Sequence, residues 1–279
     1  MIGGTQLIVV YYLFPKLGFL LNIDWVSFIG ISLGCILIAG GGNLINDICD
    51  IRSDAINKPG RNLIGLSIEK SKAKIYYLLL NILGVGLILI TLINNNTIHK
   101  IWMYLSCIAL LYLYSKKIKG ILILSNLIIS CLILISIWII PLTYVEVSEF
   151  IQQKLVIGFL FSFSLVAFLL NVAREINKDI EDIRGDYANK LQTIPIVLGR
   201  NTSRLIIYII LFLSFLSILL YYYFWFERSW INLVYFILLV FTPLFWVSIE
   251  YQKQKINYKA ISTLLKISML FGILSILLI

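Results

Sequence analysis

Residues 43–54 read Asn43-Leu-Ile-Asn46-Asp47-Ile-Cys-Asp50-Ile-Arg52-Ser-Asp54 and follow directly on an apolar run at residues 26–42. Asn46, Asp50 and Asp54 are spaced i, i+4 and i+8. In a helix these positions drift by only about 40° a step, so the three side chains line one face over roughly 12 Å. Burying an unpaired carboxylate near membrane depth is costly, so this stretch is a candidate functional site at the end of a membrane span.

A second polar stretch follows the apolar run at residues 155–172, and it reads Arg174-Glu-Ile-Asn-Lys178-Asp179-Ile-Glu-Asp182-Ile-Arg-Gly-Asp186. Asp179, Asp182 and Asp186 follow i, i+3 and i+7, and Glu175 lies one turn earlier on the same stripe. Carboxylates at this spacing repel one another, so they are tolerated mainly where cations bind. The second stretch therefore predicts the same kind of site as the first.

The composition indicates a protein that lies in a bilayer. Hydrophobic residues make up 60% of the 279 residues and charged residues 13%, and the mean hydropathy is +0.96. We predict an all-α polytopic membrane protein, with nine transmembrane helices around a central cavity and Asp-rich motifs on the cytoplasmic side. The spans are expected at about residues 3–21, 26–42, 75–93, 100–114, 121–140, 155–172, 205–226, 231–249 and 260–279.

The distribution of basic residues orients these spans, because Lys and Arg accumulate in cytoplasmic loops. The segments after the second, fourth, sixth and eighth spans hold 18 of the 23 Lys and Arg residues. We therefore expect a multi-pass protein of the cell membrane whose N-terminus and two acidic motifs are cytoplasmic and whose C-terminus is outside. The net charge of +9 then indicates topology and contact with anionic membrane lipid, and no nucleic-acid partner is expected.

The two acidic stretches lie at matching places along the chain. They open the two longest segments between spans, at about residues 43–74 and 173–204, which lie four spans apart. We predict one membrane-embedded domain over residues 1–279. It would consist of two pseudo-repeated four-helix units, at about 1–119 and 120–250, and a ninth helix.

The residue types around both stretches favour Mg²⁺. His99 is the only histidine, so a site built on several histidines is excluded. Mg²⁺ prefers oxygen ligands and is usually held by one or two carboxylates together with substrate phosphates. Because Arg174 and Lys178 lie beside the second cluster, we expect a diphosphate carried on metal. The expected metal ligands are Asn46, Asp47, Asp50, Asp54, Asp179, Asp182 and Asp186.

The motif Asn-Asp-x-x-Asp-x-x-x-Asp at 46–54, together with the run at 174–186, resembles the UbiA-type intramembrane prenyltransferases. The likeness covers essentially the whole chain. The second motif is most similar to the branch that makes archaeal-type ether lipids, digeranylgeranylglyceryl phosphate synthase. Members of the family usually carry a polar and basic stretch before and into the first span, whereas this chain begins almost at the span.

The resemblance implies Mg²⁺-dependent transfer of a polyprenyl group from its diphosphate to a membrane-associated acceptor. The expected group is geranylgeranyl, and the expected acceptor is geranylgeranylglyceryl phosphate. Asp50, Asp54, Asp182 and Asp186 take the catalytic positions of the two motifs. The residues expected to bind the diphosphate are Asn46, Arg61, Arg174, Lys178, Tyr112, Lys116 and Lys119.

The family also has a Tyr and a Lys after the fourth span, and here two pairs are candidates. Tyr112 with Lys116 has the usual spacing, and Tyr114 with Lys119 is one residue longer. The register stays open at this point, and a cluster of positive-inside lysines anchored by interfacial tyrosines is the alternative reading.

Other functions also remain open. Within the family, the acceptor could be an aromatic quinone precursor of the 4-hydroxybenzoate, dihydroxynaphthoate or homogentisate type. An ion-coupled transporter is a more distant alternative, because its carboxylates are expected singly at mid-span. Lys266, near the middle of the last span, has no role in any of these readings.

Overall fold

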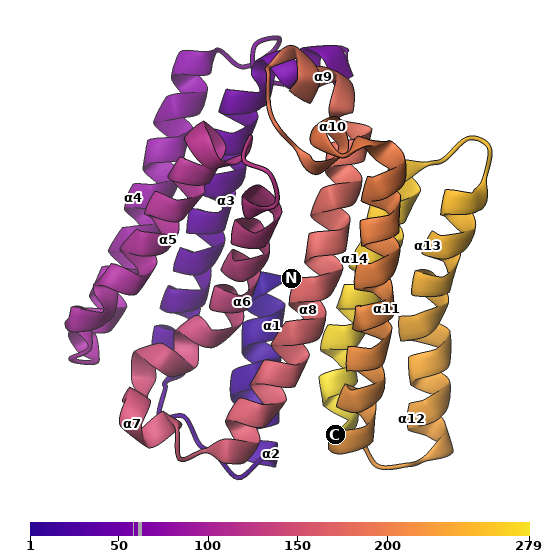
Figure 1. The fold of residues 1–279 in the computed structure, drawn as a ribbon. Helices are drawn as coiled ribbons and strands as arrows, with labels where there is room; N and C mark the ends of the chain where they lie inside the picture. Colours follow the sequence, from indigo (N-terminus) through magenta and orange to yellow (C-terminus); the bar gives the residue numbers. More distant parts are fainter. Residues whose placement is uncertain (58, 61–62) are drawn as a thin grey trace.

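The computed structural model describes residues 1–57, 59–60 and 63–279, and within these ranges every regular element is a helix (Figure 1). The first half of the chain forms α1 (Ile2–Ile8), η1 (Val9–Leu13), α2 (Phe14–Lys16), α3 (Trp25–Asn57), α4 (Lys70–Asn94), η2 (Ile98–Lys100), α5 (Ile101–Leu113), η3 (Tyr114–Ile118), α6 (Leu124–Tyr144) and α7 (Val147–Phe150). The second half forms α8 (Lys154–Glu181), α9 (Ile183–Ala188), α10 (Ile194–Val197), α11 (Gly199–Trp225), α12 (Trp230–Tyr235), η4 (Phe236–Phe241), α13 (Thr242–Gln252), α14 (Tyr258–Leu274) and η5 (Ser275–Leu278). The all-α prediction is confirmed.

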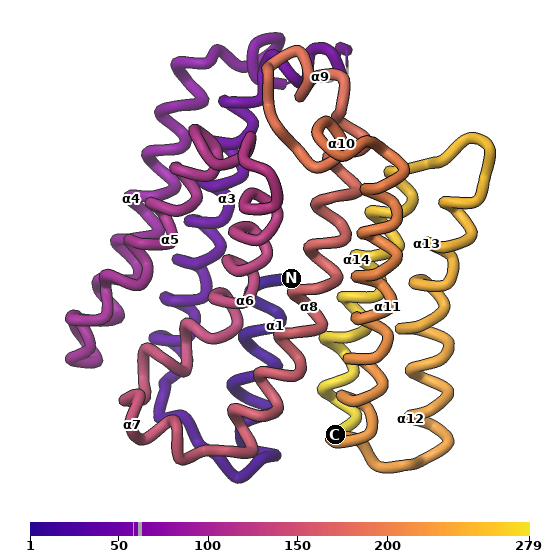
Figure 2. The backbone as a smooth tube through the Cα atoms, in the orientation of Figure 1, coloured from indigo at the N-terminus to yellow at the C-terminus, as the bar shows by residue number. Residues whose placement is uncertain are grey.

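Seven helical segments of the described chain are long and apolar enough to cross a membrane. They are Trp25–Asn57, Lys70–Asn94, Leu124–Tyr144, Lys154–Glu181, Gly199–Trp225, Trp230–Gln252 and Tyr258–Leu278. The segment Trp230–Gln252 joins α12, η4 and α13 into one rod, as the tube in Figure 2 shows. Segments of this length and hydropathy make the chain a multi-pass membrane protein.

The predicted spans at 3–21 and 100–114 are also helical but shorter. The first comprises α1, η1 and α2, and it ends at Lys16, two residues before Gly18 takes a left-handed φ of 74°. The second centres on α5, which has 13 residues and is about 20 Å long. Each short segment also contains or borders a π-helical turn, η1 in the first and η3 in the second.

Both acidic stretches lie at the same end of the bundle. α3 and α8 run in the same direction, and their C-terminal ends lie beside α9 and α10 at the upper end of Figure 1. The C-terminus of the chain lies at the opposite end. The fold therefore brings together two segments that are more than a hundred residues apart in the sequence.

Glycines bring α3 and α4 into close contact. A Cβ atom on Gly34 would lie 2.5 Å from a side-chain carbon of Ile88 and 2.9 Å from the carbonyl oxygen of Gly84. A Cβ on Gly84 would in turn meet the carbonyl oxygen of Gly34 at 3.0 Å. Helices inside lipid gain their contact by van der Waals packing, so small residues at the interface let the two backbones approach.

The polar C-terminal end of α8 is fixed to the last two helices by one asparagine. Asn177 is fully buried, and its Nδ2 donates to the carbonyl oxygen of Tyr258 at 2.8 Å and to the hydroxyl of Ser262 at 3.0 Å. Its Oδ1 accepts from the hydroxyl of Tyr251 at 2.7 Å. These bonds set the antiparallel register of α8 against α14, because Asn177 lies level with the first turn of α14.

A second asparagine attaches α9 to the end of α3. Asn57 Nδ2 donates to the carbonyl oxygen of Asp182 at 2.9 Å, and its Oδ1 accepts from the backbone N–H of Gly185 at 2.9 Å. Gly185 lies so close that a Cβ there would be 2.5 Å from both Asn57 Nδ2 and the carbonyl oxygen of Ser53. The two acidic stretches are thus in direct contact, and the contact requires glycine at position 185.

We expect Gly185→Ala to destabilise the protein by about 1–3 kcal/mol, because the backbone oxygen of Ser53 has no freedom to move away from the added methyl group. Thermal unfolding of the detergent-solubilised protein measures the effect. Gly86→Ala in α4 is the matched control, since its Cβ would meet no atom within 4 Å and alanine favours helix. Equal melting temperatures for the two variants would refute the importance of this contact.

Candidate active site

The two acidic stretches line one cavity of about 230 Å³ between α3, α8 and α9. Its lining includes every carboxylate expected from the sequence: Asp47, Asp50 and Asp54 from α3, and Asp179, Asp182 and Asp186 from α8, α9 and the residue between them. Other polar lining residues are Asn43, Asn46, Tyr114, Glu175, Lys119 and Lys178. We call this space the acidic cavity.

On the α3 side, Asp50 is held from two directions. Asn46 Nδ2 donates to Asp50 Oδ2 at 2.8 Å, and Lys119 Nζ forms an ion pair with the same oxygen. Burial by itself would lower the pKa of Lys119, but the carboxylate of Asp50 raises it above its usual value. Lys119 is therefore a fully charged cation at the wall of the acidic cavity.

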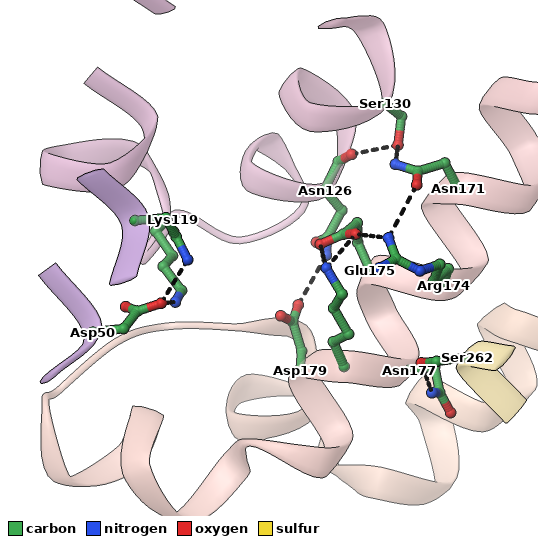
Figure 3. A network of polar contacts seen from close by, with 12 residues as sticks. Asp50, Lys119, Asn126, Ser130, Asn171, Arg174, Glu175, Asn177, Asp179 and Ser262 are labelled. Carbon is green, nitrogen blue, oxygen red and sulfur yellow. Dashed lines mark hydrogen bonds and ion pairs between the residues drawn. The ribbon is translucent and has the colours of Figure 1, made fainter. Parts of the chain in front are cut away.

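On the α8 side, a chain of hydrogen bonds links the carboxylates to α6 (Figure 3). Asp179 Oδ2 accepts from Asn126 Nδ2 at 2.9 Å, and the carbonyl oxygen of Asn126 accepts from the hydroxyl of Ser130 at 2.7 Å. Asn171 Nδ2 donates to Ser130 at 3.1 Å. Asp179 is thus oriented by side chains that the sequence motif does not include.

Glu175 is the carboxylate with most cationic partners in this region. It accepts from Arg174 Nη1 at 2.7 Å (Figure 3). It also accepts from Lys178 Nζ at 2.7 and 3.0 Å. Arg174 and Glu175 are adjacent in α8 and Lys178 lies one turn further on, and of the three only Glu175 and Lys178 line the acidic cavity. Glu175 therefore holds Lys178 at the edge of that cavity.

Two buried oxygens of the acidic cavity lack hydrogen-bond donors among the described residues. They are Asn46 Oδ1 and Asp186 Oδ1. Burial raises the pKa of Asp186 to about 6, and the neighbouring carboxylates add to this effect while Lys119 opposes it. Unsatisfied buried oxygens are costly, and a hard cation would satisfy both.

The donor set fits Mg²⁺ in kind. Within the described residues, no three His, Cys, Asp or Glu side chains are gathered closely enough to ligate one ion by themselves. Mg²⁺ is usually bound by only one or two carboxylates, and its other ligands are water and phosphate oxygens. Carboxylates that are too far apart to ligate one ion by themselves are therefore compatible with Mg²⁺. The opposed walls of the acidic cavity therefore suit ions that are completed by a phosphate ligand.

The structure distinguishes the two Tyr and Lys pairs. Tyr114 and Lys119 line the acidic cavity. Tyr112 is exposed with Lys116 over its ring, 5.6 Å from the centroid, and Lys116 faces a neighbouring basic groove. The cause is the π-helical turn η3, in which the N–H of Lys119 bonds the carbonyl oxygen of Tyr114 at 2.9 Å and so brings residues five apart onto one side.

The remaining expected residues lie elsewhere. Arg174 lines two apolar cavities and does not border the acidic cavity. Arg61 lies outside the described residues. Asn43, Glu175 and Asn126 contribute to the site although they were not expected there; Glu175 could have been found from its place on the Asp179 stripe, whereas Asn126 carries no signal in the sequence.

An apolar cavity of about 310 Å³ adjoins the acidic cavity. We call it the first apolar cavity. The two cavities share Asn43, Leu111, Ile129, Glu175 and Lys178, and the walls of the first apolar cavity come mainly from α3, α5 and α6. It adjoins a groove between α5, α6 and α8 that includes the exposed side chains of Trp102 and Phe161. A ligand with a long apolar chain and a charged head could therefore place its chain in the first apolar cavity and its head in the acidic cavity.

Comparison with known proteins identifies relatives over nearly the whole chain. The model of the UbiA prenyltransferase family matches residues 17–270. Digeranylgeranylglyceryl phosphate synthase of Methanosphaera stadtmanae is 31% identical over 243 residues, which cover 86% of this chain and 84% of the relative. The protein of the same name from Saccharolobus solfataricus is 34% identical over 268 residues, covering 94% and 89%.

Two solved structures share the fold. One comes from work on digeranylgeranylglyceryl phosphate synthase in membranes and has a TM-score of 0.61 and 25% identity, covering 99% of this chain and 92% of that chain. The other is a UbiA homolog from Archaeoglobus fulgidus bound to DMAPP and Mg²⁺, with a TM-score of 0.61, 14% identity, and coverage of 99% and 96%. At this identity the second likeness concerns the fold alone.

We expect Asp186→Asn to weaken divalent-cation binding in the acidic cavity by about tenfold or more, because one charged oxygen ligand is lost. Electron paramagnetic resonance of Mn²⁺, titrated into the detergent-solubilised protein with inorganic diphosphate present, measures this. Asp24→Asn is the control, since Asp24 binds Ser27 at the start of α3, far from the cavity. Unchanged Mn²⁺ affinity in Asp186→Asn would exclude this residue as a ligand.

Proposed function

Because this chain belongs to the UbiA prenyltransferase family, we propose that it transfers a geranylgeranyl group from its diphosphate to a glycerol-phosphate lipid in the membrane. The names of the Methanosphaera and Saccharolobus relatives support this donor and acceptor, and both relatives are matched over more than four-fifths of their length. The reaction then belongs to ether-lipid biosynthesis, and its acceptor is geranylgeranylglyceryl phosphate.

The observation that carries the proposal is the acidic cavity opening onto the first apolar cavity. The diphosphate would lie among the carboxylates with Lys119 and Lys178 beside it, and the prenyl tail would extend between α3, α5 and α6. The groove between α5, α6 and α8 supplies a route for this tail from the bilayer. Tyr114, which lines the acidic cavity, would take the role that the resemblance gives to the family's tyrosine.

Mg²⁺ would be held by Asn46, Asp50 and Asp54 on one wall and by Asp182 and Asp186 on the other, with Asp47 and Asp179 nearby. When bound, it neutralises charge on the diphosphate and so makes that group a better leaving group. Lys119 and Lys178 add positive charge at the edge of the same cavity. This charge stabilises the negative charge that develops on the diphosphate as it leaves.

The transfer exchanges one carbon–oxygen bond for another. The bond between the prenyl C1 and the diphosphate oxygen breaks, and its electron pair leaves with the diphosphate. C1 then bonds to the hydroxyl oxygen of the acceptor, whose proton passes to an oxygen of the departing diphosphate. The apolar side chains of the first apolar cavity, such as Leu111 and Ile129, exclude water that would otherwise capture the allylic cation.

We expect purified protein to transfer label from geranylgeranyl diphosphate to geranylgeranylglyceryl phosphate when Mg²⁺ is present, and to lose this activity with a chelator. Asp50→Asn and Asp182→Asn should each lower the rate by about 100-fold or more, because each removes a charge that binds the metal and diphosphate. Asp24→Asn should retain the rate.

Assays with different acceptors distinguish the proposed function from its alternatives. Transfer to 4-hydroxybenzoate, dihydroxynaphthoate or homogentisate in place of the glycerol lipid would make the protein an aromatic prenyltransferase. Absence of transfer to any acceptor would leave ion-coupled transport as the reading of the carboxylates. Full activity in both Asp variants would refute the assignment of the metal site.

The proposed orientation puts the acidic cavity, the N-terminus and the basic loops on the cytoplasmic side of the cell membrane. In this arrangement the chain crosses nine times, in two four-helix units at about 1–119 and 120–250 and a ninth helix. The concentration of 18 of the 23 basic residues in the predicted cytoplasmic segments supports it.

A C-terminal fusion tests this orientation. Alkaline phosphatase fused after Ile279 should be active, because it folds only outside the cytoplasm, and green fluorescent protein at the same place should be dark. Fluorescence with an inactive phosphatase would reverse the orientation. Fusions after Lys117, a basic residue in a predicted cytoplasmic segment, should give the opposite pattern and serve as the control.

A further inference from the structure

Lys266 is a cation in the middle of a membrane span, and the proposed transfer gives it no function. It lies eight residues after the start of α14 at Tyr258, about 12 Å below the end of the bundle that carries the acidic cavity. No carboxylate of a described residue forms an ion pair with it. Lys266 is exposed and lines a cavity, and a charged side chain at membrane depth is costly without a partner, so an anion bound in that cavity would stabilise it.

Arg174 lies at the same level as Lys266. The bonds of Asn177 to Tyr258 and Ser262 fix α8 antiparallel to α14, and one turn further along, Arg174 comes level with Lys266. Both residues line one further cavity of about 320 Å³. Arg174 Nη1 binds Glu175, but its Nε is buried and has no acceptor among the residues that the structure describes.

The charges in this region do not balance. Among the described residues that line this cavity, Arg174 and Lys266 are cations and none is a carboxylate. Two positive charges therefore border the cavity without a negative charge in its wall. A phosphate monoester carries up to two negative charges and presents several acceptor oxygens, so it matches both the charge and the free donors.

The rest of this cavity is apolar, and we call it the second apolar cavity. Its wall is built by side chains such as Leu170 of α8, Ile218 of α11 and Ile273 of α14. A Cβ on Gly272 would meet nothing within 4 Å, so this part of the wall faces open space. The second apolar cavity adjoins the first, and the two share Ile2 of α1, Ile133 and Ser136 of α6, and Asn171 and Arg174 of α8.

We propose that the second apolar cavity binds the acceptor lipid, with its prenyl chain along α8 and α14 and its phosphate between Arg174 and Lys266. This inference rests on the proposed function. The phosphate site would lie one helical turn from the acidic cavity, because Arg174 and Lys178 bind the same carboxylate and Lys178 lines that cavity. The acceptor hydroxyl, two carbons from the phosphate oxygen, then faces the prenyl C1 of the donor.

Lys266 is therefore a specificity-determining residue that selects a phosphorylated acceptor. The donor is held separately, by the acidic cavity and the first apolar cavity. Two chain-binding cavities that meet at one cation explain how a reaction between two long-chain substrates avoids competition for a single groove.

Equilibrium binding to the full-length protein in mild detergent tests the proposal. The probes are geranylgeranylglyceryl phosphate, the corresponding neutral geranylgeranylglycerol, and geranylgeranyl diphosphate. The wild-type protein should bind the phosphorylated lipid about 10- to 100-fold more tightly than the neutral lipid, as expected for charge-assisted hydrogen bonds. Lys266→Met should remove this preference and leave the affinity for the diphosphate donor unchanged, whereas Lys266→Arg should keep it.

Two further variants control for general effects. Lys259→Met removes an exposed cation from the same helix two turns nearer the bundle end, and it should keep the preference for phosphate. Gly272→Leu adds a side chain to the second apolar cavity, and its Cβ would meet no neighbouring atom. It should lower the affinity for both acceptor lipids about tenfold and leave the affinity for the donor unchanged.

The outcomes separate this inference from the proposed function. An intact preference for phosphate in Lys266→Met, or an equal loss of donor binding, would overturn the acceptor site. If the wild-type protein transfers prenyl groups but Lys266→Met still prefers the phosphorylated lipid, only the proposed acceptor site is refuted. If the wild-type protein binds the phosphorylated lipid as expected yet transfers nothing, the proposed function fails and the site stands.

Discussion

The arrangement of the site depends on the attachment of α9 to the last turns of α3. Asn57 supplies both halves of this contact, a donor to the carbonyl of Asp182 and an acceptor for the N–H of Gly185. Because each acidic stretch is carried by a different long helix, neither stretch alone could fix the width of the cavity between them. The two backbone bonds of one side chain do so, and the absence of a Cβ at Gly185 allows them to form.

Polar side chains of α8 form hydrogen bonds to several other helices inside the bundle. Asn171, Glu175 and Asn177 bind partners on α6, on α8 itself and on α13 and α14. In lipid each unmade bond of this kind would cost several kcal/mol, so the network restricts how α8 can rotate or slide. Some buried polar atoms lack partners in the described part of the chain, and among them Asn46 Oδ1, Asp186 Oδ1 and Arg174 Nε border the cavities assigned to ligands.

The sequence predicts the class of the fold and the core of the site, because both follow from local periodicity. The spacing of Asn46, Asp50 and Asp54 already indicates one helical face. Two acidic helical faces are costly in a membrane protein unless they share a site, so the sequence indicates that the two faces lie opposite each other. The docking through Asn57 depends on contacts between residues more than a hundred positions apart, which no spacing reveals. Hydropathy gives the seven long spans and the short run at 100–114, but it does not show that a π-helical turn follows α1 and another follows α5.

The π-helical turn after α5 has a consequence for comparing this chain with its relatives. An α turn closes over four residues and a π turn over five, so the same side of the helix is reached one position later. Tyr114 and Lys119 are separated by that extra position and yet face the same cavity. A comparison with relatives by spacing alone would select Tyr112 and Lys116, which do not line that cavity. The π-helical turn at η3 is therefore needed to decide which tyrosine and lysine to compare.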